Sequence, residues 1–327
     1  MSPQPHRALV TAPARGSGLD LLRQMAEVVL DPWIDQNPIR IMNAEQLAER
    51  ASAEGADILV VEADLCGAAV FELDLLAVGS CRGDPNNVDL GAATAAGIPV
   101  LNAPGRNADA VAEMTVGLLI AATRWILPAD RDVRAGRTMS DGTIPYQRFR
   151  GWQVAGRTAG LIGLGAVGRA LRWRLEGLGM TVISYDPYAP DATSTLDELL
   201  STADVISMHA PVTAETSRMI GAAQFEAMRD GVVFLNTARA QLHDTDALVA
   251  ALESGKVAAA GLDHFEGEFL DAGHPLCGMD NVVLTPHIGG ASYDTEANHT
   301  RMIAEDLSRL LAGERPLHIV NPEVLEH

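Results

Sequence analysis

The chain has 327 residues, of which 47% are hydrophobic and 20% charged, so it holds enough apolar material for about two folded domains. The 43 acidic and 24 basic residues give a net charge of −19, which argues against general nucleic-acid binding because that needs a basic surface. Lys256 is the only lysine, and this nearly excludes Schiff-base and pyridoxal chemistry. A cationic side chain that binds an anion in this protein is therefore expected to be an arginine rather than a lysine.

Three cysteines, Cys66, Cys81 and Cys277, form no C-x-x-C pair. They favour neither a disulfide framework nor a cysteine-rich zinc site, and we expect no metal site. The N-terminus lacks an apolar signal region, and the most apolar stretch, 111–126, is too short to span a bilayer. These features predict a cytoplasmic protein with neither membrane nor nucleic-acid partners.

The first third of the chain alternates short apolar runs with helical patterns. Strands are predicted at 7–11, 57–61, 75–79 and 98–101, and helices at 19–30 and 88–96. Such alternation is typical of a parallel sheet covered by helices. The predicted strands are nearly continuous apolar runs, as expected for strands buried on both faces.

A long apolar helix is predicted next, at 108–125, and is followed by a stretch, 131–154, that we expect to be a connecting loop. The alternation restarts at Thr158 and continues to about Ile288, and apolar residues at helical spacing predict a last helix at 293–311. The two alternating blocks predict two α/β domains with a ligand-binding cleft between them.

The strongest local signal is a G-x-G-x-x-G sequence, Gly163-Leu164-Gly165-Ala166-Val167-Gly168, between a predicted strand and a predicted helix. The first glycine permits a tight turn, the second lets the backbone approach a pyrophosphate, and the third allows close packing of helix on strand. The helix N-terminus then offers free amides to the anion. The structural alternative is a turn that binds nothing.

A second predicted strand, 181–185, ends in Asp186, about 20 residues beyond the glycines. A carboxylate there can accept hydrogen bonds from both ribose hydroxyls and would repel a 2′-phosphate. The sequence therefore predicts a dinucleotide site that prefers NAD to NADP.

Three polar segments follow apolar strands, at the sheet edge where open α/β folds place their active sites. They contain Arg239, Asp263 with Glu268, and His287. A planar guanidinium suits a carboxylate substrate, and a histidine can act as general acid or base near neutral pH. Glu268 is a plausible partner that holds the imidazolium and raises its pKa. A salt-bridge arginine and a structural histidine are the alternatives.

Taken together, these motifs resemble those of the NAD-dependent D-2-hydroxyacid dehydrogenases, which include phosphoglycerate, glycerate and lactate dehydrogenases of D specificity. The resemblance covers nearly the whole chain. It runs through Asn86–Asp89, Gly97–Val100, Val111–Glu113, the glycine motif, Asn236–Arg239 and Thr285–Gly290. It implies an oxidoreductase (EC 1.1.1.-) that transfers a hydride between NAD(H) and a D-2-hydroxy acid or 2-keto acid.

The resemblance also implies a role for individual residues. Arg239 would bind the substrate carboxylate, His287 would exchange the proton with the substrate oxygen, and Glu268 would be its partner. The cofactor-binding residues would be Gly163, Gly165, Ala166, Val167, Gly168, Asp186, His209, Pro211, Thr237, Ala238 and Asp263. Arg82 and Gly83 would contact the substrate carboxylate from the smaller domain, and Arg106 is a further candidate substrate contact.

Family members fold as two doubly wound parallel-sheet domains. The resemblance thus predicts a discontinuous flavodoxin-like substrate domain, 1–104 plus 291–327, and a Rossmann NAD-binding domain, 105–290. It also implies a homodimer built around the second domain, with the helix at 108–125 in the interface region.

The sequence departs from the family pattern at several positions. Glu62 stands where phosphoglycerate-oxidising relatives have an arginine, so a substrate phosphate would be repelled. Ala240, His243 and Phe269 replace a glycine, an apolar residue and a proline, and His243 is unexplained. Arg82 and Arg106 suggest a sugar acid or another polar, or doubly anionic, 2-hydroxy acid; alternatively, Arg82 acts only through its backbone and Arg106 is a solvated loop residue.

Two other functions stay open on sequence grounds. An NAD-sensing regulatory protein of dehydrogenase fold could retain the same three residues. A formate dehydrogenase is disfavoured because it would need glutamine in place of Glu268.

Overall fold

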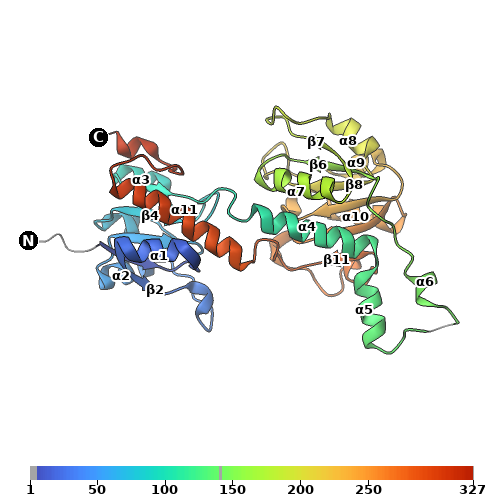
Figure 1. The fold of residues 1–327 in the computed structure, drawn as a ribbon, viewed down its shortest axis with the longest axis horizontal. Helices are drawn as coiled ribbons and strands as arrows, with labels where there is room; N and C mark the ends of the chain where they lie inside the picture. The colour runs from blue at the N-terminus through green and yellow to red at the C-terminus, as the bar shows by residue number, and fades with distance from the viewer. Residues whose placement is uncertain (1–5, 140–141, 327) are drawn as a thin grey trace, which may run out of the picture. The chain divides into compact units, whose positions relative to one another are not determined.

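The computed structural model describes residues 6–139 and 142–326, and the chain divides into two compact units. Unit 1 comprises Met1–Asn107 and Ser292–His327, and unit 2 comprises Ala108–Ala291. Each unit is a parallel sheet with helices on both faces (Figure 1). The prediction of two doubly wound α/β domains is confirmed.

Unit 1 contains a five-stranded parallel sheet in the order β2-β1-β3-β4-β5. Its strands are β1 (His6–Val10), β2 (Ala26–Leu30), β3 (Ile58–Val61), β4 (Ala77–Ser80) and β5 (Val100–Leu101), and its helices are α1 (Gly16–Met25), α2 (Ala44–Glu54), α3 (Leu90–Ala95) and α11 (Tyr293–Leu311). This is the strand order of flavodoxin-like folds, in which the chain changes direction between the first and third strands.

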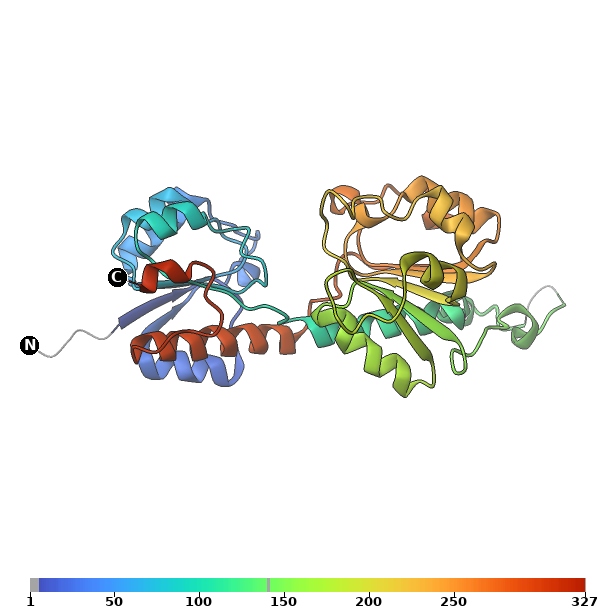
Figure 2. The same ribbon diagram turned by 90° about the horizontal axis from the view of Figure 1, so that it is seen from above.

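Figure 2 shows α1 and α11 on one face of this sheet and α2 and α3 on the other. The first face buries Leu22 and Ile303 against strand residues such as Val60, and the second buries Leu47 against Leu59. Helices α1 and α11 touch so closely that a Cβ at Gly18 would lie 2.3 Å from the Arg301 nitrogen, so this position requires glycine. The C-terminal helix is thereby fixed to unit 1.

Unit 2 contains a six-stranded parallel sheet in the order β11-β10-β9-β8-β6-β7. Its strands are β6 (Thr158–Ile162), β7 (Thr181–Tyr185), β8 (Val205–Met208), β9 (Val232–Asn236), β10 (Val257–Leu262) and β11 (Val282–Leu284), and its helices are α4 (Ala108–Thr123), α5 (Ile126–Arg134), α6 (Pro145–Arg148), α7 (Ala166–Gly177), α8 (Leu196–Thr202), α9 (Ala222–Ala227) and α10 (Thr245–Glu253). The chain reverses direction between β6 and β8, where such folds bind their ligands.

Both faces of the unit 2 sheet are buried. Helices α4 and α7 cover one face through Leu119 and Leu171, and α8, α9 and α10 cover the other through residues such as Phe225. Phe225 and Phe234 meet edge to face, with ring centroids 5.3 Å apart. The carboxyl ends of the strands are thereby held on a rigid frame.

The structure differs from the sequence prediction in three places. The helix expected at 19–30 ends at Met25, and Ala26–Leu30 forms β2 instead, because Val28 and Val29 add a parallel edge strand beside β1. No breaker residue marks this change, since the Ala26 amide closes the helix without a loop. The loop expected at 131–154 contains the end of α5 and the short α6, while α2 was not predicted at all.

No single helix among the described residues is long and apolar enough to cross a membrane. Helices α4 and α5 reach the necessary length and composition only as a pair, and that pair is bent by 67°.

Candidate active site

The turn between β6 and α7 is built by glycines that cannot be replaced without a clash. Gly163 has a φ of +97°, and a Cβ there would lie 2.5 Å from the Ala210 nitrogen. A Cβ on Gly168 would lie 2.3 Å from the Gly163 oxygen. The first clash concerns the segment after β8 and the second the start of α7, so the two glycines bring strand, turn and helix into direct backbone contact.

Gly165 differs because a Cβ there would meet nothing within 4 Å. It is the N-cap of α7 and its helix has no side-chain cap, so the amides of the first turn, around Ala166 and Val167, have no side-chain acceptor. An uncapped helix start beside an open glycine surface fits the pyrophosphate of a dinucleotide.

Asp186 follows β7 and lies against this turn. Its carboxylate accepts hydrogen bonds from the Leu164 amide (2.7 Å) and the Tyr188 amide (2.9 Å), and it is half-buried. A carboxylate can accept about four hydrogen bonds, so these two contacts leave capacity for the ribose hydroxyls that the sequence assigns to it.

His209 and Pro211 follow β8, next to the glycine turn. A hydrogen bond of 2.8 Å joins His209 Nε2 to the Ser207 hydroxyl, and burial lowers the pKa of His209 to about 4. The imidazole is therefore neutral at physiological pH. Pro211 is exposed.

The end of β9 is shaped by the amide of Asn236. Its Nδ2 donates to the Arg239 carbonyl (2.8 Å) and to His243 Nδ1 (3.0 Å), and its oxygen accepts from the Ala238 amide. His243 is 2% exposed, and burial lowers its pKa to about 4, so it acts as a neutral acceptor. This explains the histidine that the sequence left unexplained, because it holds the side chain that forms the Arg239 turn.

Arg239 points away from this buried network. Its side chain is exposed, its Nη1 donates to the Ala238 carbonyl (2.6 Å), and no carboxylate of the described residues lies within ion-pair distance. Thr237, in contrast, is buried and hydrogen-bonded to Thr115 (2.8 Å). The turn thus presents a guanidinium that can bind an anion without first breaking an ion pair.

Asp263, at the end of β10, is fully buried and braces the segment that carries His287. Its carboxylate accepts from the Thr285 hydroxyl (2.6 Å) and from the amides of Ile288 (2.9 Å) and Gly289 (2.7 Å). Its carbonyl also accepts from the His287 amide (2.8 Å). These four bonds fix the backbone of His287, while the contact of Asp263 with the cofactor stays a prediction.

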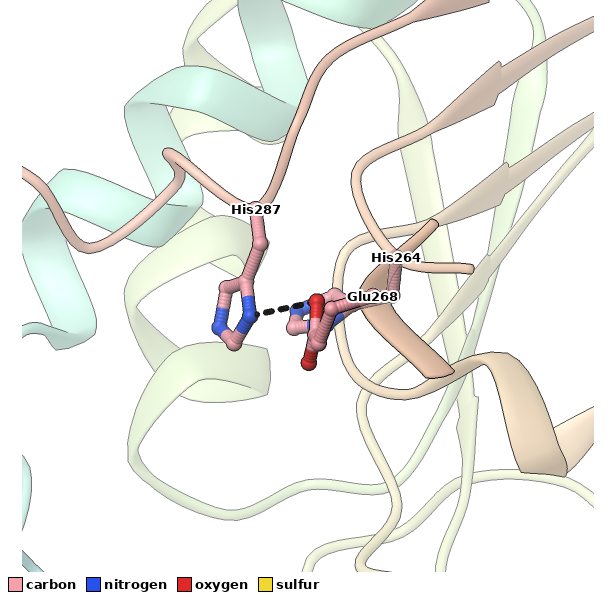
Figure 3. A group of neighbouring side chains, drawn as sticks. All are labelled: His264, Glu268 and His287. Carbon is pink, nitrogen blue, oxygen red and sulfur yellow. Dashed lines mark hydrogen bonds and ion pairs between the residues drawn. The ribbon is translucent and has the colours of Figure 1, made fainter. Parts of the chain in front are cut away.

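His287 and Glu268 point toward one another (Figure 3). Because a carboxylate only accepts, His287 Nδ1 donates to Glu268 Oε2 over 3.0 Å. Both residues have positive φ, +55° for His287 and +57° for Glu268, which is uncommon for residues other than glycine. Strained backbone at both members of an exposed pair is typical of functional sites. With Nδ1 held, Nε2 is the nitrogen left for proton exchange.

His264 lies beside this pair and was not singled out from the sequence. Its ring centroid is 3.8 Å from that of His287, and only 5% of the residue is exposed. Burial, followed by the charges of His287 and Arg239, lowers its pKa to about 4. The available signal was a histidine directly after Asp263, at the end of a predicted strand.

The predicted substrate residues Arg82, Gly83 and Arg106 lie in unit 1, after β4 and β5. Arg82 donates to the Glu62 carbonyl (2.7 Å), and the Gly83 carbonyl accepts from Asn102 (2.6 Å). Arg106 forms an ion pair with Glu62 and donates to His299 Nδ1 (2.6 Å). The charge of Glu62, which the sequence analysis set against a phosphate, is thus balanced by Arg106.

Comparison with known proteins agrees with this arrangement. The family model "D-isomer specific 2-hydroxyacid dehydrogenase, NAD binding domain" matches residues 116–289. A glyoxylate reductase of Thermofilum pendens is 36% identical over 320 residues, covering 94% of this chain and 92% of that protein. A D-3-phosphoglycerate dehydrogenase of Archaeoglobus fulgidus is 39% identical over 261 residues, covering 77% of this chain but only 48% of that longer protein.

Among solved structures, the D-lactate dehydrogenase of Escherichia coli aligns with a TM-score of 0.75 at 27% identity, covering 96% of this chain and 99% of the other. Both the family match and the full-length relative thus extend over the glycine turn and the segments that carry Arg239, Glu268 and His287. The chain belongs to the NAD-dependent D-isomer specific 2-hydroxyacid dehydrogenases, a family of oxidoreductases.

Proposed function

We propose that this protein reduces a short, polar 2-keto acid to the D-2-hydroxy acid with NADH, and catalyses the reverse oxidation with NAD. The observation that carries the proposal is the His287–Glu268 pair, hydrogen-bonded over 3.0 Å, at the edge of the sheet where the neighbouring strand β9 ends in an arginine without an ion-pair partner among the described residues. Proton exchange and carboxylate binding are the two tasks that the protein itself must perform in this reaction.

The three side chains would divide the chemistry as follows. The Arg239 guanidinium binds the substrate carboxylate and polarises the keto oxygen. NAD supplies or accepts the hydride. In reduction, His287 Nε2 gives a proton to the oxygen that hydride addition leaves anionic, and in oxidation it takes the proton back. Glu268 holds Nδ1 and stabilises the imidazolium that the reductive direction needs.

The cofactor would lie on the open glycine surface of α7. The amides of Gly165, Ala166 and Val167 would hold the pyrophosphate, and Asp186 would hold the ribose. Further contacts are proposed for Gly163, Gly168, His209, Pro211, Thr237, Ala238 and Asp263. The carboxylate of Asp186 would disfavour a 2′-phosphate, and this supports NAD over NADP.

Unit 1 would supply the substrate contacts, through Arg82, Gly83 and Arg106. Since Arg106 is already paired with Glu62 and His299, it offers little net charge to a second anionic group of the substrate. This favours a small or hydroxylated keto acid over a doubly anionic one. The glyoxylate reductase relative, which this chain matches over nearly its whole length, supports the same substrate class.

The test is a panel of 2-keto acids assayed by the loss of NADH absorbance, with glyoxylate, hydroxypyruvate, pyruvate, a sugar-derived 2-keto acid and a dicarboxylic 2-keto acid as substrates. We expect the highest kcat/KM on the small or hydroxylated monoanions. A preference for the dicarboxylic acid would overturn the assignment of Arg106, and no turnover on any keto acid would overturn the enzymatic function. The alternative of an NAD-sensing regulator has no support from the relatives above, each named as an enzyme.

We further propose a cytoplasmic homodimer that associates through unit 2. Helix α5 and the residues around α6 expose large apolar side chains, including Val133 (65% exposed) and Tyr146 (80% exposed), as expected of an interface rather than of solvated surface. The three free cysteines agree with a reducing compartment. Light scattering coupled to size exclusion should give twice the chain mass, and Val133→Glu should give monomers.

A further inference from the structure

Three metal-binding side chains converge at the candidate active site. His264, Glu268 and His287 each offer one ligand atom, and all three atoms lie within 4.8 Å of one another (Figure 3). They come from the end of β10, the turn that follows it and the segment after β11. No metal site was predicted from the sequence, because the three residues lack the close spacing of known zinc motifs.

His264 has no evident structural reason to be a histidine. It is 95% buried, and its Nδ1 has no hydrogen-bond partner among the described residues. An unpaired buried polar atom is unfavourable, and an apolar side chain would fill the same space without that cost. His264 Nδ1 is therefore available to a ligand.

The donor set indicates which ligand that is. Two imidazoles and one carboxylate, with further positions left to solvent, are the ligands of zinc sites that keep an open coordination position. Tetrahedral coordination with bonds of about 2.0–2.1 Å needs donor atoms about 3.3 Å apart. Glu268 and His287 are exposed, so their side chains can rotate to close the remaining gap. Magnesium and calcium prefer all-oxygen sites.

We propose that His264, Glu268 and His287 form a site for a divalent transition-metal ion such as zinc, and that the bound ion reversibly inhibits the dehydrogenase. The inhibitory effect rests on the proposed function, because the ion would occupy Glu268 and His287. It would replace the hydrogen bond between them and remove the imidazole from proton exchange. His264 is the member of the site that catalysis does not need.

The experiment first measures binding without turnover, on the full chain treated with chelator. Zinc affinity is obtained by competition with a chromophoric chelator, and cobalt is followed by its visible absorption bands. His264→Phe keeps an aromatic ring against His287 but removes the ligand, and Glu268→Gln changes an exposed residue that the fold does not need. The control is His274→Gln, a histidine of the same loop that lies outside the cluster.

We expect wild type and His274→Gln to bind zinc with the same affinity. Both His264→Phe and Glu268→Gln should bind zinc at least about tenfold more weakly, because loss of even an indirect partner of a metal site lowers metal affinity by that factor. Zinc should then inhibit wild-type turnover, chelator should restore it, and magnesium at the same concentration should do neither. Inhibition of His264→Phe should require correspondingly more zinc.

Equal zinc affinity in His264→Phe and wild type would overturn the site, as would absence of zinc binding to wild type. Binding at the cluster that leaves turnover unchanged, or raises it, would overturn the inhibitory role. Because binding is measured without substrate, zinc binding in a chain that reduces no keto acid would count against the proposed function and leave the metal site standing.

Discussion

Each of the two units contains a set of one arginine, one glutamate and one histidine, and the two sets differ in burial and in hydrogen bonding. In unit 1, Arg106 binds both Glu62 and His299. Arg106 and Glu62 are half-buried, and His299 is completely inaccessible, with its Nε2 donating to the Pro13 carbonyl (2.6 Å). In unit 2, the histidine and glutamate of the corresponding set, His287 and Glu268, are exposed and paired. The arginine, Arg239, is exposed and has no carboxylate partner in the described parts of the chain.

The difference shows what separates a structural set from a reactive one. In unit 1 each charge is satisfied by a protein group, so the set stabilises its own unit. In unit 2 the Arg239 guanidinium and His287 Nε2 can still form hydrogen bonds to a ligand. The backbone of both His287 and Glu268 is strained. Residue type alone would not have distinguished the two sets, so matched changes in both are the direct test.

The largest effect is expected from replacing each histidine with glutamine. His287→Gln should lower kcat by about 10²–10⁴-fold, the usual worth of a general acid–base group, while NADH binding is retained. His299→Gln should lower the free energy of unfolding by about 1–3 kcal/mol, because Arg106 or the Pro13 carbonyl would lose a partner, and should change kcat far less. Steady-state kinetics, NADH fluorescence titration and urea unfolding measure these effects. Loss of NADH binding in His287→Gln would contradict the assignment.

The two arginines give the next contrast when each is changed to methionine. Arg239→Met should reduce kcat/KM about 100-fold or more without loss of stability, since a charge-assisted hydrogen bond is worth about 1.5–3 kcal/mol and this side chain is exposed. Arg106→Met should destabilise the protein by about 1–3 kcal/mol, because half-buried Glu62 and buried His299 both lose their arginine partner, while Glu62 keeps the Trp33 indole as a donor. The reverse pattern, an unstable Arg239→Met and a stable but inactive Arg106→Met, would show that the reactive and structural sets have been exchanged.

A smaller effect is expected at the open glycine of the dinucleotide turn. Gly165→Ala adds a Cβ that meets no protein atom within 4 Å, at a backbone conformation that alanine adopts, so stability should not change. The added methyl stands on the surface proposed for the pyrophosphate, so the Kd for NADH should rise about tenfold, or about 1.4 kcal/mol. Gly278→Ala is the control, because a Cβ there also meets nothing nearby. Equal NADH affinity in both variants would show that the cofactor does not bind at this surface.

A pH dependence of stability is expected from the buried histidines. Burial lowers the pKa of His209, His243, His264 and His299 to about 4, against an ordinary value of 6.5. The unfolded chain therefore takes up protons first as the pH falls, and stability that is complete above pH 6.5 is lost progressively toward pH 4. Each histidine contributes at most about 1.4 kcal/mol per pH unit.

This prediction is checked by urea unfolding at several pH values. The slope of stability against pH between 6.5 and 4 should be shallower in both His243→Gln and His299→Gln than in wild type. An unchanged slope in both variants would mean that these imidazoles are not kept neutral by burial.

Much of the site could be predicted from sequence because it lies in short, continuous motifs. The glycine turn, Asp186 and the residues after β9 and β11 each follow an apolar strand, and parallel strands bring their carboxyl ends to one edge. Long-range contacts were not predicted: the contact of His264 with His287, the brace from Asp263 to Ile288 and Gly289, and the support that His243 gives to Asn236. Each depends on side-chain directions at positions far apart in the chain.

From the sequence alone we could predict the fold class, the dinucleotide motif and NAD as the cofactor, because these follow from local periodicity and from residue types at fixed spacing. The assignment of the chemistry to Arg239, Glu268 and His287 has the same basis and stays a prediction. Only the tertiary structure decided that Ala26–Leu30 is a strand, that Arg106 is neutralised by Glu62 while Arg239 is not, and that His264 lies beside Glu268 and His287. Burial and charge pairing are set by contacts between distant segments, and the same side chain is structural or reactive according to those contacts.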